Sequence, residues 1–311
     1  MHKYVLKRLV MIIPVVLIVS FAVFAIMSIV PGDIALTVLG DEASPEALER
    51  FREERGLNDP LIIQYARYIS GIVRMDLGTS AFNNVDVWEI YFDRLPNTLL
   101  LAGASVLFAV VLSIPLGIWA AIRQNTWIDT GASIVSFFGL AMPNFWIGLL
   151  LIILFSVNLG LLPAQGATEG FRSLILPTIT LGTGLMAAIT RTTRSAMLDV
   201  INQDYLRTAR SKGLPERKVI NKHALKNAWI PIVTMVGTQV ATLVGGSVIT
   251  ERVFSWPGIG SYLVDSILRN DYPVVTGFVI MTSIIVSLVL LGVDLLYAFL
   301  DPRIKAQYAK G

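Results

Sequence analysis

Long apolar runs with few or no charged residues are the feature that most constrains the fold of this chain. The first run covers residues 9–30, and five others follow at 98–122, 133–162, 174–190, 230–250 and 274–297. Each is near or above the roughly 20 residues that a helix needs to cross a bilayer. Only 15% of the residues are charged, whereas soluble domains carry about 25%. The sequence therefore predicts an all-α, polytopic transmembrane bundle of about six spans.

The positions of Lys and Arg predict that both termini lie in the cytoplasm. With the N-terminus inside, 16 Lys and Arg residues fall in the inside segments and 9 in the outside segments. Most of the outside ones belong to one long segment, which counts little because long segments are translocated largely regardless of their charge. The first run is longer than the apolar core of a signal peptide, and no small-residue cleavage site follows it. We therefore expect a retained first span rather than a removed signal.

The long outside segment, residues 31–97, reads as a mostly helical extracytoplasmic insertion in a single membrane domain of residues 1–311. Ser44-Pro45-Glu46 is typical of a helix start, Gly56 of its end, and Asp59-Pro60 of a second start. An apolar stripe follows on the second helix, formed by Ile62, Ile63, Ala66, Ile69 and Val73. The insertion is then either a cap that packs on the spans or a docking surface for an external partner.

The sequence lacks the motifs of several enzyme classes. It contains no phosphate-binding loop of the G-x-x-x-x-G-K-[ST] type, no H-E-x-x-H and no G-x-S-x-G, and it has no cysteine. Asp294 is the clearest ionisable residue within a span, and it is either a functional acid or a structural group near Tyr297. Because the spans carry so few ionisable groups, we expect the driving force for any transport to come from outside this chain.

The fifth run carries a pattern of small residues. Gly237, Ala241 and Gly245 recur every four residues, which lets helices approach each other closely. This face either packs within the chain or lies against a second membrane subunit or a permeation path. Asn144 and Gln239 are candidate polar residues of such a path, with an interhelical hydrogen bond as the alternative role for each.

A basic segment between the fourth and fifth runs is predicted to be a cytoplasmic loop, residues 191–229. Gly213 and Pro215 suggest two short helices hinged at the glycine. Lys218, Lys222 and Lys226 share one helix face, and Ile220, Ala224 and Ala228 share the opposite face. Binding to anionic lipid headgroups explains the charge. It does not explain the break at Gly213.

This loop resembles the EAA loop of the membrane subunits of bacterial ABC importers. Arg207-Thr208-Ala209 stands in place of E-A-A, Gly213 matches the glycine, and Ile230-Pro231 matches the ending. Residues 205–213, YLRTARSKG, match the variant of the dipeptide and oligopeptide permease branch. Further stretches resemble the "B" type permease of that branch: VPGD (30–33), DLGTS (76–80), RLPNT (94–98), AMPNFW (141–146), ERVFSWPGIG (251–260), NDYP (270–273) and DPR (301–303).

The resemblance implies a transport subunit rather than an enzyme. Its expected partners are a second homologous permease, two cytoplasmic P-loop ATPases, an extracytoplasmic solute-binding protein and the lipid bilayer of a bacterial inner membrane, with no nucleic acid. The chain itself would bind no cofactor, because ATP and Mg²⁺ would bind to the ATPases. The residues expected to couple to the ATPase are Asp204, Tyr205, Arg207, Thr208, Ala209, Gly213, Leu214, Pro215 and Arg217.

The cargo implied by the resemblance is a dipeptide or oligopeptide, with nickel or glutathione as alternatives for the same machine. More distant alternatives, from other classes, are a stand-alone secondary transporter or channel and a membrane scaffold without transport. Dependence on an ATPase would separate the importer from all of these.

Overall fold

The computed structural model describes residues 2–29, 34–40 and 42–300. Within these ranges the regular structure is helical, apart from one isolated bridge between Thr79 and Asp86. Five helices are long and apolar enough to cross a membrane, and a bent helix pair brings the number to six if it counts as one span. The predicted all-α bundle is therefore confirmed. The VPGD stretch at 30–33 and the DPR stretch at 301–303 lie outside the described residues.

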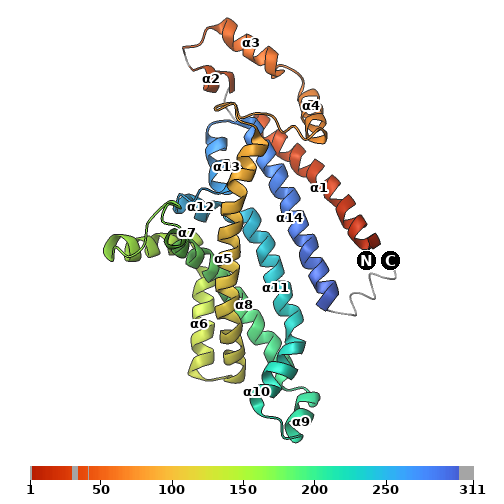
Figure 1. The fold of residues 1–311 in the computed structure, drawn as a ribbon, viewed down its shortest axis with the longest axis vertical. Helices are drawn as coiled ribbons and strands as arrows, with labels where there is room; N and C mark the ends of the chain where they lie inside the picture. The colour runs from red at the N-terminus through yellow and green to blue at the C-terminus, as the bar shows by residue number, and fades with distance from the viewer. Residues whose placement is uncertain (1, 30–33, 41, 301–311) are drawn as a thin grey trace.

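Five long helices form the bundle: α1 (His2–Ile29), α5 (Val87–Ile122), α8 (Phe171–Ile201), α11 (Leu225–Gly246) and α14 (Tyr272–Leu300). In Figure 1, α5, α8 and α11 run side by side, and α1 lies on the far side of α14. The apolar window of α8 is 67% buried, whereas that of α1 is only 6% buried. The shortest predicted run is thus the most enclosed helix, because α8 packs against α5, α6 and α11.

The third run, 133–162, is predicted as one helical span, and in the structure it is broken. It forms α6 (Trp127–Ala141), α7 (Asn144–Leu151) and the π-helical η1 (Ile152–Asn158), and the chain bends by 103° between α6 and α7. Met142 at the bend is extended, with φ −81° and ψ 131°. Pro143 explains this conformation, because proline disfavours the helical region for the residue before it and cannot donate a backbone hydrogen bond.

Three short helices form a cap at one end of the bundle (Figure 1): α2 (Ile34–Leu39), α3 (Pro45–Arg55) and α4 (Leu61–Val73). The expected helix signals of α3 are confirmed. The Ser44 side chain accepts a hydrogen bond from the Ala47 amide, and Gly56 ends the helix in the left-handed region at φ 62°. Helix α5 begins at Val87, inside the segment 31–97, because the Asp86 side chain caps it by accepting a hydrogen bond from Trp88.

The face of α4 that packs on the bundle differs from the predicted apolar stripe. Ile62 and Val73 of the stripe are 75% and 80% exposed. The contacts to α1 come from the two tyrosines of α4. The Tyr65 hydroxyl donates to the Leu17 carbonyl at 3.0 Å, and Tyr68 stacks on Phe24. The helical period places an apolar stripe correctly along a helix, but it does not identify which face meets the neighbour.

Two short helices, α12 (Val248–Val253) and α13 (Ile259–Leu268), connect α11 to α14; α12 lies beside α7, and α13 is the nearer of the two to the cap (Figure 1). The fifth predicted run therefore ends at Gly246 rather than at Thr250, which belongs to α12. At the other end of the bundle, Asp294 of α14 pairs with Arg8 of α1 at 3.0 Å. This ion pair favours the structural role for Asp294 over the functional one.

Candidate functional site

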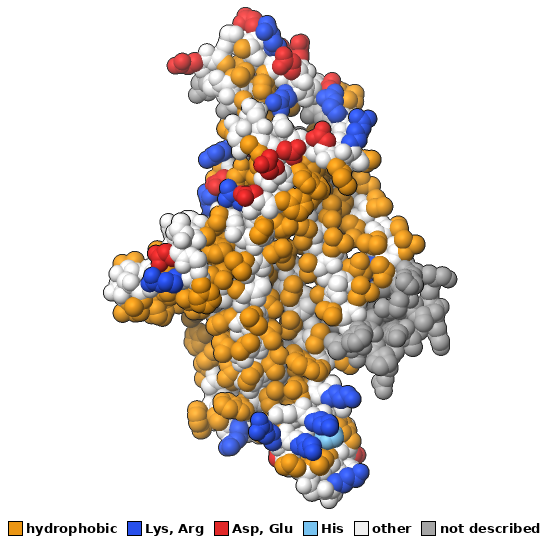
Figure 2. Space-filling model, viewed as in Figure 1, with side chains coloured by type: hydrophobic (Ala, Val, Ile, Leu, Met, Phe, Trp, Pro, Cys, Tyr) orange, Lys and Arg blue, Asp and Glu red, His pale blue; other side chains and the backbone are white. Residues whose placement is uncertain are grey.

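The loop between α8 and α11 forms the end of the molecule opposite the cap. It contains α9 (Asp204–Ser211), α10 (Glu216–Lys218) and the π-helical η2 (Val219–Ala224). Lys and Arg side chains gather at this end (Figure 2). The second of the two predicted short helices is not separate, because the helical chain runs without a break from Glu216 through η2 into α11. Of the helices in this loop, α9 alone is separated from its neighbours by turns.

Helix α9 has two different faces. Leu206 and Ala209 are buried in an apolar cluster that includes Met197 of α8 and Ala224 of η2. The remaining predicted residues of this helix are exposed: Asp204, Tyr205, Arg207 and Thr208. The helix is thus fastened to the bundle by apolar contacts and presents a polar surface outwards, which suits contact with a second protein. We call these four exposed residues, together with Gly213, the coupling surface.

Gly213 makes the turn between α9 and α10. Its φ is +75°, and a Cβ added there would meet nothing within 4 Å. Glycine is therefore required by the left-handed backbone rather than by crowding. The turn then brings Leu214 against the apolar cluster, while Pro215 and Arg217 stay exposed around the start of α10. The nine predicted coupling residues thus lie on α9, in the turn that follows it and, for Arg217, in α10.

Two polar contacts hold α9 in place, and sequence reasoning missed the partners in both. Across the Gly213 turn, Arg210 donates to Glu216 at 2.9 and 3.1 Å. These hydrogen bonds raise the pKa of the Arg210 guanidinium above its ordinary value. Further along, Asn227 of α11 donates its side-chain amide to the Tyr205 hydroxyl at 2.7 Å. No local periodicity relates residues that meet across a turn or between two helices.

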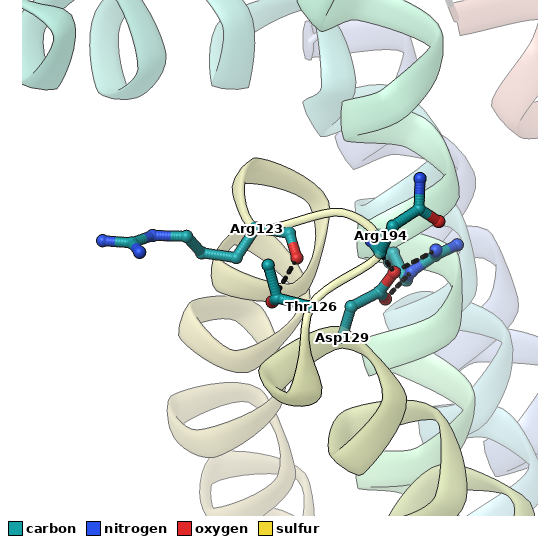
Figure 3. A network of polar contacts seen from close by, with 5 residues as sticks. Arg123, Thr126, Asp129 and Arg194 are labelled. Atoms are coloured by element: carbon teal, nitrogen blue, oxygen red, sulfur yellow. Dashed lines mark hydrogen bonds and ion pairs between the residues drawn. The ribbon is translucent and has the colours of Figure 1, made fainter.

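A partly buried ion pair joins the start of α6 to α8 (Figure 3). Arg194 of α8 donates to the two carboxylate oxygens of Asp129 at 2.5 and 2.8 Å, and the Asn125 amide donates to the same carboxylate at 3.0 Å. Arg123 points away from the pair. Two parallel hydrogen bonds of this kind fix the relative geometry of the two side chains as well as stabilising them. The pair therefore joins α6 to α8. Arg194 lies one helical turn before Met197, which belongs to the apolar cluster under α9.

The five predicted pathway or interface residues lie in different environments. Gly237 and Ala241 are buried within the chain, which favours the intrachain packing role. Gly245 borders a cavity of 260 Å³ between α5, α11, α13 and α14. Gln239 is half-buried, and Asn144 is exposed at the start of α7, beside the 103° bend. Within the apolar part of α11, three exposed threonines that the sequence analysis did not single out also present hydroxyls: Thr234, Thr238 and Thr242.

A second buried polar network fastens the α12–α13 connection to α5. The Glu251 side chain is fully buried, and it accepts hydrogen bonds from the Thr98 hydroxyl at 2.8 Å, the Ser247 hydroxyl at 2.8 Å and the Ser261 amide at 3.0 Å. Trp256 adds a bond from its ring nitrogen to the Asn97 carbonyl at 3.0 Å. Glu251, the glutamate of the ERVFSWPGIG stretch, is thus the residue that links α12 and α13 to α5.

The comparisons with known proteins agree with this architecture. Residues 113–306 match the family described as the inner membrane component of binding-protein-dependent transport systems, and residues 1–102 match the N-terminal part of such components. The chain belongs to this family of binding-protein-dependent transport system membrane components. It is a multi-pass permease subunit of an ABC importer and not an enzyme.

Three curated relatives match nearly the whole chain. The oligopeptide transport system permease protein AppB of Bacillus subtilis (strain 168) is 42% identical, over 98% of this chain and 100% of AppB. The dipeptide transport system permease protein DppB of Alkalihalophilus pseudofirmus is 39% identical, over 98% of this chain and 100% of DppB. The glutathione transport system permease protein GsiC of Salmonella paratyphi A is 42% identical, over 98% of this chain and 99% of GsiC.

Solved structures of the MetNI methionine ABC transporter, in inward-facing conformations, share the fold. One crystal form aligns with a TM-score of 0.55 and 18% identity, covering 69% of this chain and 97% of the matched chain. A second aligns with a TM-score of 0.56 and 22% identity, covering 68% and 96%.

Proposed function

We propose that this chain forms half of the translocation pathway of an ATP-driven importer for dipeptides or oligopeptides, and that α9 transmits the motion of a separate ATPase. The observation that carries the proposal is the amphipathic structure of α9 and the turn that follows it. Its polar face is exposed, its apolar face is buried, and a left-handed glycine follows it. A ligand or partner shifts a two-state element only through contacts that differ between the two states. A separately anchored, outward-facing helix can supply such contacts.

The proposed roles of the nine coupling residues differ with their burial. Asp204, Tyr205, Arg207 and Thr208 would touch the ATPase directly, and Pro215 and Arg217 would border that contact. Ala209 and Leu214 face the apolar cluster, so they would hold the surface in position rather than touch the partner. Gly213 would set the angle at which α9 leaves α10.

The proposed orientation places the α9 end and both termini in the cytoplasm and the cap outside. The gathering of Lys and Arg at the α9 end supports it, because cytoplasmic segments carry the excess of these residues. The cap helices α2–α4 would then face the solute-binding protein.

The proposed complex contains this chain, a second homologous permease, two P-loop ATPases and a solute-binding protein, within the lipid bilayer. ATP and Mg²⁺ would bind to the ATPases, and this chain would bind no cofactor and no nucleic acid. The names of the relatives AppB and DppB support a peptide cargo. Glutathione is the second candidate, because GsiC is as similar to this chain as AppB is. Nickel remains an alternative that none of these three relatives supports.

Isolation of the chain from native membranes tests the complex. We expect a P-loop ATPase, a second multi-span protein and a secreted binding protein to co-purify, and the ligand in the binding protein identifies the cargo. In a Tyr205→Ala/Arg207→Ala variant the ATPase should be lost while the second permease stays. An Arg123→Ala variant is the matched control on the same end of the molecule. Recovery of the chain alone, or of the ATPase with the double variant, would contradict the proposal.

A further inference from the structure

A basic groove lies beside the coupling surface, along the face of the helix that runs from α10 into α11. Its volume is 670 Å³. The lining residues come from four successive helical turns: Pro215, Arg217, Lys218, Asn221, Lys222, Leu225, Lys226 and Trp229. Cavities of roughly 300–1,000 Å³ are typical of sites for small ligands, so this groove is large enough for one.

The charge in the groove is not neutralised by the chain. Arg217, Lys218, Lys222 and Lys226 line it, and no acidic residue does. None of these four cations forms an ion pair within the described part of the chain. The carboxylate nearest in sequence, Glu216, is already held by Arg210 across the Gly213 turn. Like charges at this spacing repel one another, so an anion bound among them relieves an unfavourable arrangement.

The groove also changes character along its length. At the Gly213 end it is lined by Arg217, Lys218 and Lys222, whereas at the other end Leu225 and Trp229 flank a single cation, Lys226. Beyond Lys226, helix α11 has no charged residue through Gly246. The groove therefore lies where the sequence of this helix changes from charged to apolar, which is where we place the boundary between water and hydrocarbon. Tryptophan is enriched at that level, because its ring is apolar and its N–H is polar.

We propose that the basic groove binds the headgroup of one anionic phospholipid, with the phosphate among Lys218, Lys222 and Lys226 and the glycerol and upper acyl chains against Leu225 and Trp229. The apolar end excludes a free inorganic anion as the best-fitting ligand. The row of cations disfavours phosphatidylcholine, since the positive choline group would cancel the attraction. With the α9 end in the cytoplasm, as proposed above, the lipid comes from the inner leaflet.

The position of the groove gives this lipid a place in coupling. Pro215 lines the groove and lies two residues beyond Gly213 in the sequence. A bound headgroup would therefore brace the start of α10 next to the turn that carries α9. The lipid and the ATPase would bind on neighbouring surfaces of the same loop without sharing the exposed residues of α9.

Lipid titration of the purified, delipidated complex tests the proposal, with native mass spectrometry to count bound lipids. The probes are phosphatidylglycerol and phosphatidylcholine. The test variant is Lys222→Gln/Lys226→Gln. The matched control is Arg123→Gln/Arg191→Gln, which removes the same charge from two exposed residues that do not line the groove. A Lys222→Arg/Lys226→Arg variant keeps the charge and checks that the site tolerates substitution.

We expect the test variant to bind phosphatidylglycerol about thirtyfold more weakly, because each lysine near a lipid surface contributes roughly a factor of five. The control and arginine variants should bind as the wild type does, and phosphatidylcholine binding should not change. Equal binding of phosphatidylglycerol by the test and control variants would overturn the proposal. A second result would also overturn it: the test variant binds lipid normally but no longer co-purifies with the ATPase. The groove would then be a contact with a protein and not with a lipid. Lipid binding is measured without ATPase activity. The lipid titration can therefore fail or succeed independently of the co-purification experiment that tests the proposed function.

Discussion

Arg194 binds Asp129 through two hydrogen bonds that join α8 to the first turn of α6, at 2.5 and 2.8 Å. The Asp129 side chain is 7% exposed and that of Arg194 is 29% exposed, so the carboxylate is buried and the guanidinium is partly buried. Removing one partner from a buried pair leaves the other charge without compensation. The contact is therefore a sensitive point for the stability of the end of the molecule that carries α9.

An Asp129→Asn variant should be destabilised by about 2–3 kcal/mol, because it loses charge-assisted hydrogen bonds and strands the Arg194 guanidinium. The control is Arg123→Gln, since Arg123 points away from the pair (Figure 3) and such surface changes cost less than about 0.5 kcal/mol. Thermal unfolding of the two purified variants is the measurement. Equal midpoints for Asp129→Asn and the wild type would show that the pair does not stabilise the fold.

Replacing Gly213 with valine should reduce ATP-driven transport at least tenfold while membrane insertion stays normal. A β-branched residue at φ +75° is strained by about 1–3 kcal/mol, so the turn would relax and α9 would leave α10 at another angle. Gly213→Asn should retain more activity, because asparagine tolerates the left-handed region. Gly103→Val is the control, since Gly103 is exposed within α5 and an added Cβ meets nothing within 4 Å. Uptake by reconstituted vesicles measures the effect, and normal uptake by Gly213→Val would refute it.

The hydrogen bond between Tyr205 and Asn227 should couple these residues by about 0.5–1.5 kcal/mol in a double-mutant cycle. Tyr205→Phe removes the hydroxyl and keeps the ring, and Asn227→Ala removes the donor. Because each change already breaks the 2.7 Å bond, the double variant should lose less than the sum of the two. The apparent affinity of the ATPase for the four proteins gives the energies. Strict additivity would mean that the bond does not position α9.

Glu251→Gln should loosen the α12–α13 connection. All three groups that bind this carboxylate are donors, namely the Thr98 and Ser247 hydroxyls and the Ser261 amide. An amide in the same place would turn its NH₂ towards at least one donor and leave a buried group unsatisfied, at a cost of about 1–3 kcal/mol. Limited proteolysis between α12 and α13 should become faster in this variant.

Thr98 offers a matched pair of variants for the same network. Thr98→Ser keeps the hydroxyl and should resist proteolysis as the wild type does, whereas Thr98→Val removes it and should resemble Glu251→Gln. The Thr98 hydroxyl also accepts from the Ile259 amide at 2.9 Å, so valine leaves that amide without its partner and removes one of the three donors to the Glu251 carboxylate. Identical cleavage rates for the serine and valine variants would show that the hydroxyl is not needed.

Features set by neighbouring residues could be predicted from the sequence. The apolar runs, the Ser44 cap and the end of α3 at Gly56 all follow from helical period, side-chain capping and left-handed backbone preference. The two faces of the basic segment followed as well, because Ile220, Ala224 and Ala228 are buried while the three lysines are exposed. The left-handed turn at Gly213 was indicated by the glycine and by the likeness to the permease loop.

Only the tertiary structure decided which of these elements meet and at what angle. Pro143 disfavours a helical conformation for Met142, but the 103° turn at this point goes with the packing of α6 and α7 on α8. The Asp129–Arg194 pair joins residues 65 positions apart, and the Thr98–Glu251 bond joins residues 153 positions apart. Helical period constrains neighbours within a few turns and carries no information about distant ones. Contacts of this kind arise when whole helices pack together, and so the sequence by itself determined the helices and their faces, while packing determined the buried polar contacts between them.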